Sequence, residues 1–195
     1  MSIKKLSLLA AITIACTCTK LSAQTFMHSI GANISVMSGT VKTASSSSSE
    51  SIMLTHVSYF PRILITEGEN NSLSFGLPIG AGVGLTTDTY NSGSGVFWSF
   101  DVPAVIDYNI GVKSTPENDS RFGGYFGAGF GYTFVNWTYD GKSTSNANSY
   151  GPLVRAGMRF GFPSFNQAVS VGMYYKIGME TSKFKTIGFN VLVDL

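Results

Sequence analysis

The sequence predicts an all-β fold, an eight-stranded antiparallel up-and-down transmembrane β-barrel, and three observations support this class. Apolar residues alternate with small or polar ones, which is the period of a half-buried β-strand, whereas a helix would repeat every 3.6 residues. The alternation recurs in about eight blocks, separated by clusters of Ser, Asn, Asp, Gly and Pro. Charged residues make up only 12% of the 195 residues, against about 25% in a typical soluble domain.

The first 23 residues have the features of a secretion signal. Lys4 and Lys5 precede a short apolar segment, and Leu21-Ser22-Ala23 offers a cleavage site. The apolar segment is too short to cross a bilayer, which takes about 20 residues. We therefore expect a signal peptide at residues 1–23 and one barrel domain at residues 24–195, without a transmembrane helix.

Removal of the signal would change both the cysteine count and the charge. Cys16 and Cys18 lie within it, so the processed chain would have no disulfide and no cysteine-based metal site. Lipid modification at Cys16 is the alternative form of processing. Without Lys4, Lys5 and Lys20, 10 basic residues (13 − 3) face 11 acidic ones, so nucleic-acid binding has no electrostatic support.

The eight blocks have two faces of opposite character. The blocks span residues 27–37, 52–65, 73–85, 96–108, 126–134, 154–162, 169–177 and 187–195. In the third block, Leu73, Phe75 and Leu77 begin an apolar face, and Ser74 and Gly76 begin the other. The second block is the weakest, because it contains a proline at position 61, which requires a bulge or a position outside the hydrogen-bond ladder.

The segments between the blocks are expected to form turns or loops, because they are rich in turn-forming residues. They cover residues 38–51, 66–71, 87–94, 113–120, 140–149, 163–167 and 181–183. Ser45–Ser49, a run of serines, predicts a mobile exposed loop.

The composition of the two faces decides which of them meets lipid. The apolar face is almost free of charge and rich in aromatic rings, while the other face is mostly Gly, Ser and Asn with charges in mid-strand. An eight-stranded barrel has an interior just wide enough for ordinary side chains, so it could not hold so many large rings. We therefore expect the apolar face to point to lipid and the polar face to line the lumen.

The chain resembles the small outer-membrane β-barrels of the porin-like or outer-membrane-protein-A transmembrane class. The resemblance covers about residues 26–195 and rests on the signal, the blocks and a last strand, residues 186–195, whose alternate apolar residues end in Leu195 where Phe is commoner. It implies residence in the Gram-negative outer membrane, contact with its lipid, and recognition of the last strand by the barrel-assembly machinery. Because the family includes adhesins, small channels, stabilising proteins and a few lipid-modifying enzymes, the fold does not fix the function.

The residues suited to catalysis or metal binding are few and scattered, and we assign no catalytic, cofactor-binding or metal-ligating residue. His28 falls on the outward face and His56 on the lumenal face, neither with a Cys or His at ligand spacing. The glycine strings at residues 80–84 and 127–131 lack the spacing of a phosphate loop. Acidic residues at 67–69 and 117–119 lack the spacing of a calcium loop.

Charged residues on the polar face are the most informative set. They are Arg62, Asp101, Asp107, Arg155, Arg159 and Lys176. Because an isolated buried ion is costly, they should pair across the lumen. We expect one layer of Asp101 with Arg155 and Lys176, and a second of Asp107 with Arg159 and Arg62, with the strand-five glycines leaving room between them.

These observations favour a barrel plugged by polar and charged side chains, with a structural role or an interaction role in which its loops bind an extracellular ligand. We do not expect an enzyme or a bound cofactor. Two alternatives stay open. One is a narrow small-solute channel, and the other is a lipid-modifying hydrolase that uses His56.

Overall fold

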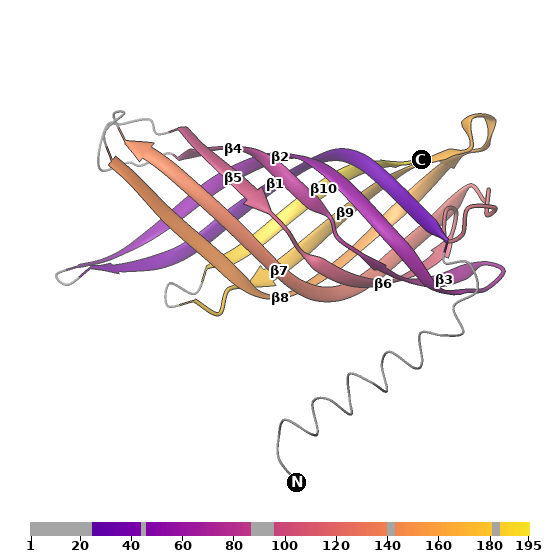
Figure 1. Cartoon of the computed structure of the whole chain (residues 1–195), viewed down its shortest axis with the longest axis horizontal. Helices are drawn as coiled ribbons and strands as arrows, with labels where there is room; N and C mark the ends of the chain where they lie inside the picture. Colours follow the sequence, from indigo (N-terminus) through magenta and orange to yellow (C-terminus); the bar gives the residue numbers. More distant parts are fainter. Residues whose placement is uncertain (1–24, 44–45, 87–95, 140–142, 181–183) are drawn as a thin grey trace, which may run out of the picture.

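The computed structural model describes residues 25–43, 46–86, 96–139, 143–180 and 184–195, and these form one closed antiparallel sheet (Figure 1). The strands are β1 (Phe26–Thr43), β2 (Ser46–Glu67), β3 (Asn71–Gly76), β4 (Ile79–Thr86), β5 (Val96–Asp101), β6 (Ala104–Gly111), β7 (Phe122–Tyr139), β8 (Ser143–Phe162), β9 (Gln167–Ile177) and β10 (Lys185–Asp194). The sheet closes because β1 pairs with both β2 and β10. A short 3-10 helix, Pro163–Phe165, links β8 to β9.

The barrel wall has eight strands, as predicted, because two of them are interrupted. Strands β3 and β4 follow each other along one line with Leu77 and Pro78 between them, and both pair with β2. Strands β5 and β6 do the same around Val102 and Pro103, and both pair with β7. Proline lacks the N–H that a sheet ladder needs, so the ladder stops at each proline and resumes after it.

The predicted faces of the strands are confirmed. Along β1 and β2, apolar side chains such as Ile34 and Val57 are exposed, while Asn33 and His56 are buried. Along β8, Val154 and its outward neighbours are exposed. The same alternation continues around the barrel, so the aromatic and aliphatic face points outward and the small polar face points inward.

Two loop predictions are wrong. Within the predicted loop 38–51, residues 38–43 and 46–51 form a paired ribbon, from Ser38 opposite Ser51 to Thr43 opposite Ser46. Within 140–149, residues 143–149 belong to β8 and pair with β7. Sheet pairing depends on backbone groups that every non-proline residue has, so serine-rich segments extend the strands once a hairpin has brought them together.

The end of the barrel at which β1 begins and β10 ends is called here the terminal end. The connector from β6 to β7, residues 112–121, also lies at this end, where Gly111 N donates to Asn70 O. Within it, Val112, Lys113 and Ser114 are buried. The connector therefore packs into the mouth of the barrel and does not extend away from it. No helix in the described ranges is long and apolar enough to cross a membrane.

Candidate functional site

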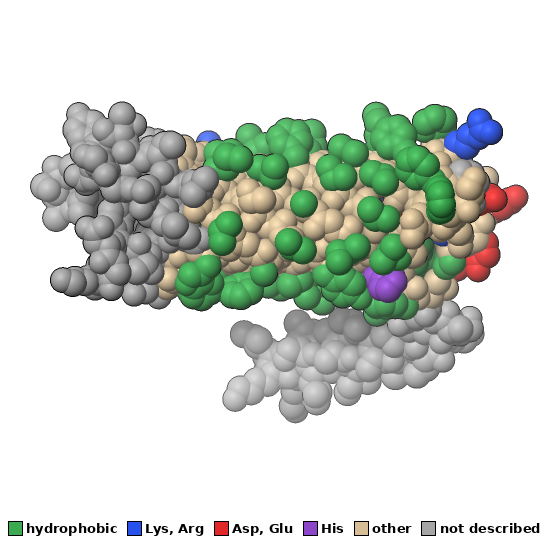
Figure 2. Space-filling view, turned by 90° about the horizontal axis from the view of Figure 1, so that it is seen from above, with side chains coloured by type: hydrophobic (Ala, Val, Ile, Leu, Met, Phe, Trp, Pro, Cys, Tyr) green, Lys and Arg blue, Asp and Glu red, His purple; other side chains and the backbone are tan. Residues whose placement is uncertain are grey.

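The outer surface carries a band of apolar side chains around the barrel wall (Figure 2). Its most exposed members include Phe122 at 70% and Val57 at 69%. In water such a surface would drive aggregation, whereas in lipid it is the expected exterior of a membrane barrel. The described part of the chain therefore has the exterior of a membrane-spanning protein.

Aromatic side chains on this exterior form contacts near both ends of the strands. Near the terminal end, His28 lies between Phe26 and Tyr59, with ring centroids 5.8 and 6.1 Å away. Toward the opposite end, Trp98 contacts Phe100 and Phe134, at 5.5 and 5.2 Å. Such rings favour the boundary between membrane and water. His28 faces outward, as predicted, and belongs to this aromatic group.

The lumen begins, at the end opposite the terminal end, with a layer of apolar side chains. This outer apolar layer consists of Met37, Ile52, Leu54, Val135 and Phe184. These side chains come from β1, β2, β7 and the residue just before β10, and they pack into one buried cluster. The prediction that polar and charged side chains fill the lumen is therefore wrong at this level, where an apolar cluster fills it.

Next to the outer apolar layer lies a polar level that contains the first predicted charges. Lys176 Nζ donates to Thr133 Oγ1, and Thr133 Oγ1 donates to Asp101 Oδ1 at 2.6 Å. His56 Nε2 lies 2.9 Å from Ser99 Oγ. Lys176 therefore meets Asp101 through Thr133, which confirms the predicted association of these two charges.

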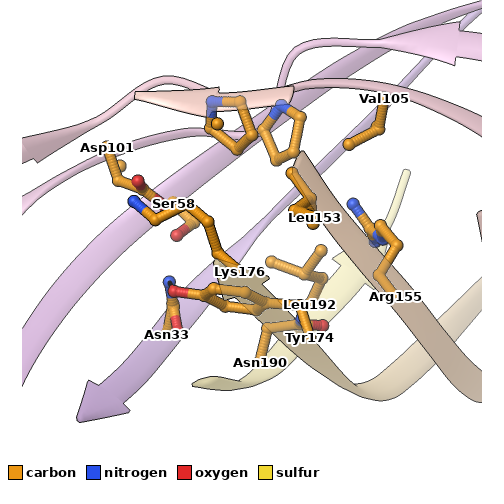
Figure 3. Close-up of a pocket in the computed structure, with 14 residues that line it drawn as sticks. Asn33, Ser58, Asp101, Val105, Leu153, Arg155, Tyr174, Lys176, Asn190 and Leu192 are labelled. Carbon is orange, nitrogen blue, oxygen red and sulfur yellow. Dashed lines mark hydrogen bonds between the residues drawn. The ribbon is translucent and has the colours of Figure 1, made fainter. Parts of the chain in front are cut away.

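A cavity of about 40 Å³ lies beside this polar level (Figure 3). Asp101, Lys176 and Tyr174 line one part of it, and Leu153 and Leu192 line another. One buried water needs roughly 10–15 Å³ by this measure, so the cavity holds about three water-sized groups. A solute the size of a sugar or an amino acid does not fit.

The next level toward the terminal end is held by Arg155. Its Nε lies 3.6 Å from Asp107 Oδ1. The guanidinium also lies over the rings of Phe60 and Tyr125, with distances to the ring centroids of 4.7 and 4.6 Å. An arginine packed between two aromatic faces is held both electrostatically and by its shape.

Asp194 is the centre of the last ionic level. Its carboxylate lies 3.2 Å from Arg62 Nη2 and 3.3 Å from Arg159 Nε, and it accepts a 2.5 Å hydrogen bond from Ser29 Oγ. All three charged side chains are only 1% exposed. Arg159 Nη2 also donates to Asn109 Oδ1 at 2.8 Å. One carboxylate therefore neutralises part of the charge of two buried guanidinium groups.

The 112–121 connector covers the Asp194 level at the terminal end and bonds to its arginines. The carbonyl oxygen of Lys113 accepts hydrogen bonds from Arg62 and Arg159, at 3.2 and 3.3 Å. The ammonium group of Lys113 donates to Asn166 Oδ1 at 2.8 Å. Ser72 Oγ donates to the carbonyl oxygen of Ser114 at 2.5 Å. The connector is thus hydrogen-bonded to both the buried arginines and the barrel wall, and it closes the terminal end.

Three predicted charge pairs are wrong, and one of them is that of Arg62, which pairs with Asp194 and not with Asp107. Arg155 pairs with Asp107 and not with Asp101, and Arg159 pairs with Asp194 and not with Asp107. The reason is the stagger between strands: Arg155 lies opposite Gly127, which lies opposite Asp107. Asp194 was absent from the predicted set of charges on the polar face. Its position near the end of the chain gave no indication that two arginines converge on it.

The prediction that glycines of the fifth block leave room for the charged side chains of the lumen is confirmed at Gly127. A Cβ atom at this position would collide with Asp107 Oδ1 and with the carbonyl oxygen of Ile106. Gly127→Ala should therefore lower the free energy of unfolding by about 1–3 kcal/mol, the usual cost of overpacking. Gly131→Ala is the control, because its Cβ would meet no backbone atom, and the nearest atom, at 3.0 Å, is Cδ of the flexible Lys176 side chain. Urea unfolding of both variants in lipid vesicles measures the difference, and equal effects would contradict this reason.

The Asp107–Arg155 pair should be energetically coupled. In a double-mutant cycle of Asp107→Ala and Arg155→Ala, we expect a coupling of about 1–3 kcal/mol, because each single change leaves its partner buried and unpaired. The cycle of Asp107→Ala with Arg159→Ala should give a smaller value, since Arg159 is paired with Asp194. If the second cycle gave the larger coupling, this assignment of pairs would be incorrect.

The other predicted features lie apart from the lumenal ion pairs. Glu67, Glu69, Glu117 and Asp119 are exposed at the terminal end. No group of three or more His, Cys, Asp or Glu residues in the described ranges is arranged to hold a metal ion. The glycines at 80–84 and 127–131 lie within β4 and β7. Lys4, Lys5, Cys16, Cys18 and the cleavage site fall outside the described residues.

Comparison with known proteins agrees with this architecture. No protein-family model matches the chain, and no curated protein matches it in sequence. Solved structures do match: the attachment invasion locus protein Ail of Yersinia pestis (TM-score 0.52, 12% identity, 89% of this chain and 98% of Ail) and Neisserial surface protein A (0.50, 14%, 89% and 99%). The outer-membrane protein OprG of Pseudomonas aeruginosa is a further match (0.50, 10%, 89% and 95%). The chain therefore has the eight-stranded fold of the small outer-membrane β-barrel proteins.

Proposed function

We propose that this protein is a non-enzymatic outer-membrane barrel with a closed lumen, which acts through the segments that it presents at the end opposite the termini. The observation that carries this proposal is the filling of the lumen. The outer apolar layer, the Arg155–Asp107 level and the Asp194 level follow one another, and the connector covers the last of them. A barrel filled in this way serves as a scaffold and not as a pore.

The paired ribbons support a role in interaction. The β1–β2 ribbon extends beyond its neighbours, because the pairing of β1 with β10 stops at Ser38 and that of β2 with β4 stops at Ile52. Strands β7 and β8 form a second ribbon, because they remain paired as far as Tyr139 and Ser143, whereas the pairing of β8 with β9 stops at Leu153. Both ribbons project at the same end of the barrel (Figure 1). In bacterial barrels the longer connections face the outside of the cell, so the ribbons would meet an extracellular ligand.

The structural neighbours are compatible with this role. One of them, Ail, has attachment and invasion in its name. The alternative of a lipid-modifying hydrolase has less support, because His56 and Ser99 both lie inside the barrel and are 1% exposed. A hydroxyl in that place is shielded from lipid headgroups. His56→Ala should accordingly leave any lipid-cleaving activity of the purified protein unchanged.

The remaining parts of the proposal concern biogenesis. Residues 1–23 would direct secretion across the inner membrane and then be removed, with cleavage after Ala23 preferred to lipid modification at Cys16. The barrel-assembly machinery would insert the processed chain into outer-membrane lipid. Intact-protein mass spectrometry of the envelope fraction tests this, because the two forms of processing give different masses.

Conductance separates a closed barrel from a narrow channel. Purified protein in a planar bilayer should give no steady current steps, because the cavity admits only about three water-sized groups and both ends are closed. A known porin in the same bilayer is the positive control. Reproducible steps that scale with the amount of inserted protein would favour the channel alternative.

The role of the ribbons requires a separate test in cells. A variant with residues 39–50 replaced by Asn-Gly, a two-residue turn that suits a hairpin, should still fold as a barrel but lose binding to extracellular partners. A strain that lacks the protein is complemented with either form and compared for surface adhesion and for resistance to detergent. If both forms restored both properties, the β1–β2 ribbon would be dispensable and the interaction role assigned to it would be contradicted.

A further inference from the structure

The two interruptions of the barrel wall lie directly opposite each other. Gly76 pairs with Val105 on one side of the interruption, and Gly80 pairs with Asp101 on the other side. Both ladders have the same register, so Pro78 and Pro103 face each other between them. We call this place, residues 77–79 and 102–104, the proline seam.

The seam lacks two hydrogen bonds that the register would otherwise provide. Leu77 N donates to Pro61 O on β2, and Val102 N donates to Tyr132 O on β7, so both of these N–H groups point away from the seam. N–H groups alternate in direction along a strand, and positions 78 and 103 would therefore donate across the seam. Proline has no N–H, so neither bond can form. At the seam the two strands are therefore not hydrogen-bonded to each other. They are held together by the ladders on either side, which resume at the pairs Gly76–Val105 and Gly80–Asp101.

The central cavity lies immediately behind the seam. Pro78 and Pro103 both line it, together with Gly80, Asp101 and Val105 from the same interrupted strands. Leu153 and Leu192 face it from the other side of the lumen (Figure 3). The apolar part of the cavity is thus lined by two proline rings and three aliphatic side chains. A weak place in the wall and the apolar part of the cavity occur at the same position.

The surroundings decide what can reach this cavity. On the outside, Leu77, Ile79 and Val102 are exposed by 36, 40 and 42%, as members of the apolar exterior. Inside, the outer apolar layer closes the lumen on one side, and the ion pairs of Arg155 and Asp194 close it on the other. The side of the cavity that is lined by Pro78 and Pro103 therefore lies next to the apolar exterior, which faces the hydrocarbon region of the bilayer.

We propose that the proline seam is a lateral binding site, through which the end of a lipid hydrocarbon chain enters the barrel wall and occupies the central cavity. The occupant is a chain of a bilayer phospholipid, because only apolar material borders the seam on the outside. The cavity of about 40 Å³ accommodates roughly three water-sized groups, which corresponds to the last few carbon atoms of the chain. This site is independent of the ribbons and of their proposed role.

Nuclear magnetic resonance in phospholipid nanodiscs tests the proposal. The protein is deuterated except for the Leu and Val methyl groups, and the lipid carries protons only on the terminal methyl groups of its chains. We expect magnetisation transfer from these chain ends to the methyl groups of Leu153 and Leu192, which face the lumen. Val102 faces lipid, so its methyl groups provide the positive signal in every sample.

Two variants block the site in different ways. The double variant Pro78→Ala with Pro103→Ala supplies both missing N–H groups, so the seam can close and the lumenal signals should disappear. Gly131→Ala narrows the cavity, since its Cβ would lie 3.5 Å from Leu153 Cδ2 and 3.7 Å from Pro103 Cβ, and it should weaken the same signals. Pro152→Ala is the matched control, because Pro152 lies on the outward face of β8, away from the cavity.

The possible outcomes are distinct. Transfer that is strong in the protein and in Pro152→Ala, but lost in the double proline variant and weakened in Gly131→Ala, supports the proposal. Absence of transfer to Leu153 and Leu192 in the folded protein, with the Val102 signal present, overturns it and indicates a cavity that holds water only. Transfer that survives in the double proline variant shows entry by another route, which also overturns it. Should the double variant not fold, Gly131→Ala decides between these results.

Discussion

The Asp194→Ala variant is expected to lose about 3–5 kcal/mol of unfolding free energy, the cost of breaking a buried ion pair by removing one partner. The expected loss is large because the Asp194 carboxylate is shared by Arg62 and Arg159, both 1% exposed, and also accepts a hydrogen bond from Ser29. Its removal leaves two guanidinium groups in the lumen without an acid. Urea unfolding in lipid vesicles, followed by tryptophan fluorescence, measures the loss.

A matched acid at the same end of the barrel provides the control. Asp119 lies on the 112–121 connector but is exposed, so Asp119→Ala should change stability by no more than about 0.5 kcal/mol. The triple variant Asp194→Ala with Arg62→Met and Arg159→Met should recover part of the loss, because it also removes the unpaired charges. A loss of less than about 1 kcal/mol in Asp194→Ala would mean that water reaches the arginines and that the terminal end is open.

The second large effect is expected on the outside of the barrel. Ala104→Arg places a charge on the outward face of β6 in mid-wall, where a cation that faces lipid costs roughly 2–4 kcal/mol. Ala104→Leu has a larger but apolar side chain at the same place and should be nearly neutral. The comparison in vesicles therefore separates the effect of charge from the effect of size. Equal damage by Leu and Arg would indicate packing and not contact with lipid.

An inward substitution completes this test of the two faces. Gly80→Ser is suitable, because a Cβ at Gly80 would approach His56 Cβ at 3.3 Å and Ser58 Oγ at 3.5 Å. Gly82, although also inward, is unsuitable, since a Cβ there would collide with the backbone oxygen of Thr55. We expect Gly80→Ser to cost much less than Ala104→Arg. The opposite order would mean that the faces are inverted.

The faces of the strands were predictable from sequence, because alternation has a period of two and needs only local information. Asp107 and Arg155 were placed on the lumenal face correctly, and so was His56. The need for glycine between charged side chains was also predictable, and Gly127 confirms it. These inferences depend on which way a side chain points and not on its height in the barrel.

The pairing of charges was not predictable in the same way. Height in a barrel depends on the stagger between neighbouring strands, which follows from the shear of the closed sheet and not from any one strand. Counting residues along the strands placed Asp101 level with Arg155, whereas the register places Asp107 there. Asp194 received no partner because both of its arginines lie on strands that do not pair with β10, namely β2 and β8.

Two other features were missed for physical reasons that are equally clear. The outer apolar layer uses residues such as Met37 and Leu54, which alternation alone assigns to the inward face but which composition would assign to lipid. The ribbon at 38–51 has a polar serine-rich sequence, which favours a loop when it is considered alone. Its strand pairing arises from the hairpin geometry of β1 and β2 below it.

The claim that this chain forms a closed barrel in the outer membrane is tested most directly by one gel. Outer-membrane fractions of cells that express the chain are loaded with and without boiling in detergent. A closed barrel resists detergent until it is heated, so we expect the unboiled protein to migrate faster than the boiled protein and to be found in the membrane fraction. A product in the soluble periplasmic fraction, with the same mobility before and after boiling, would contradict the account.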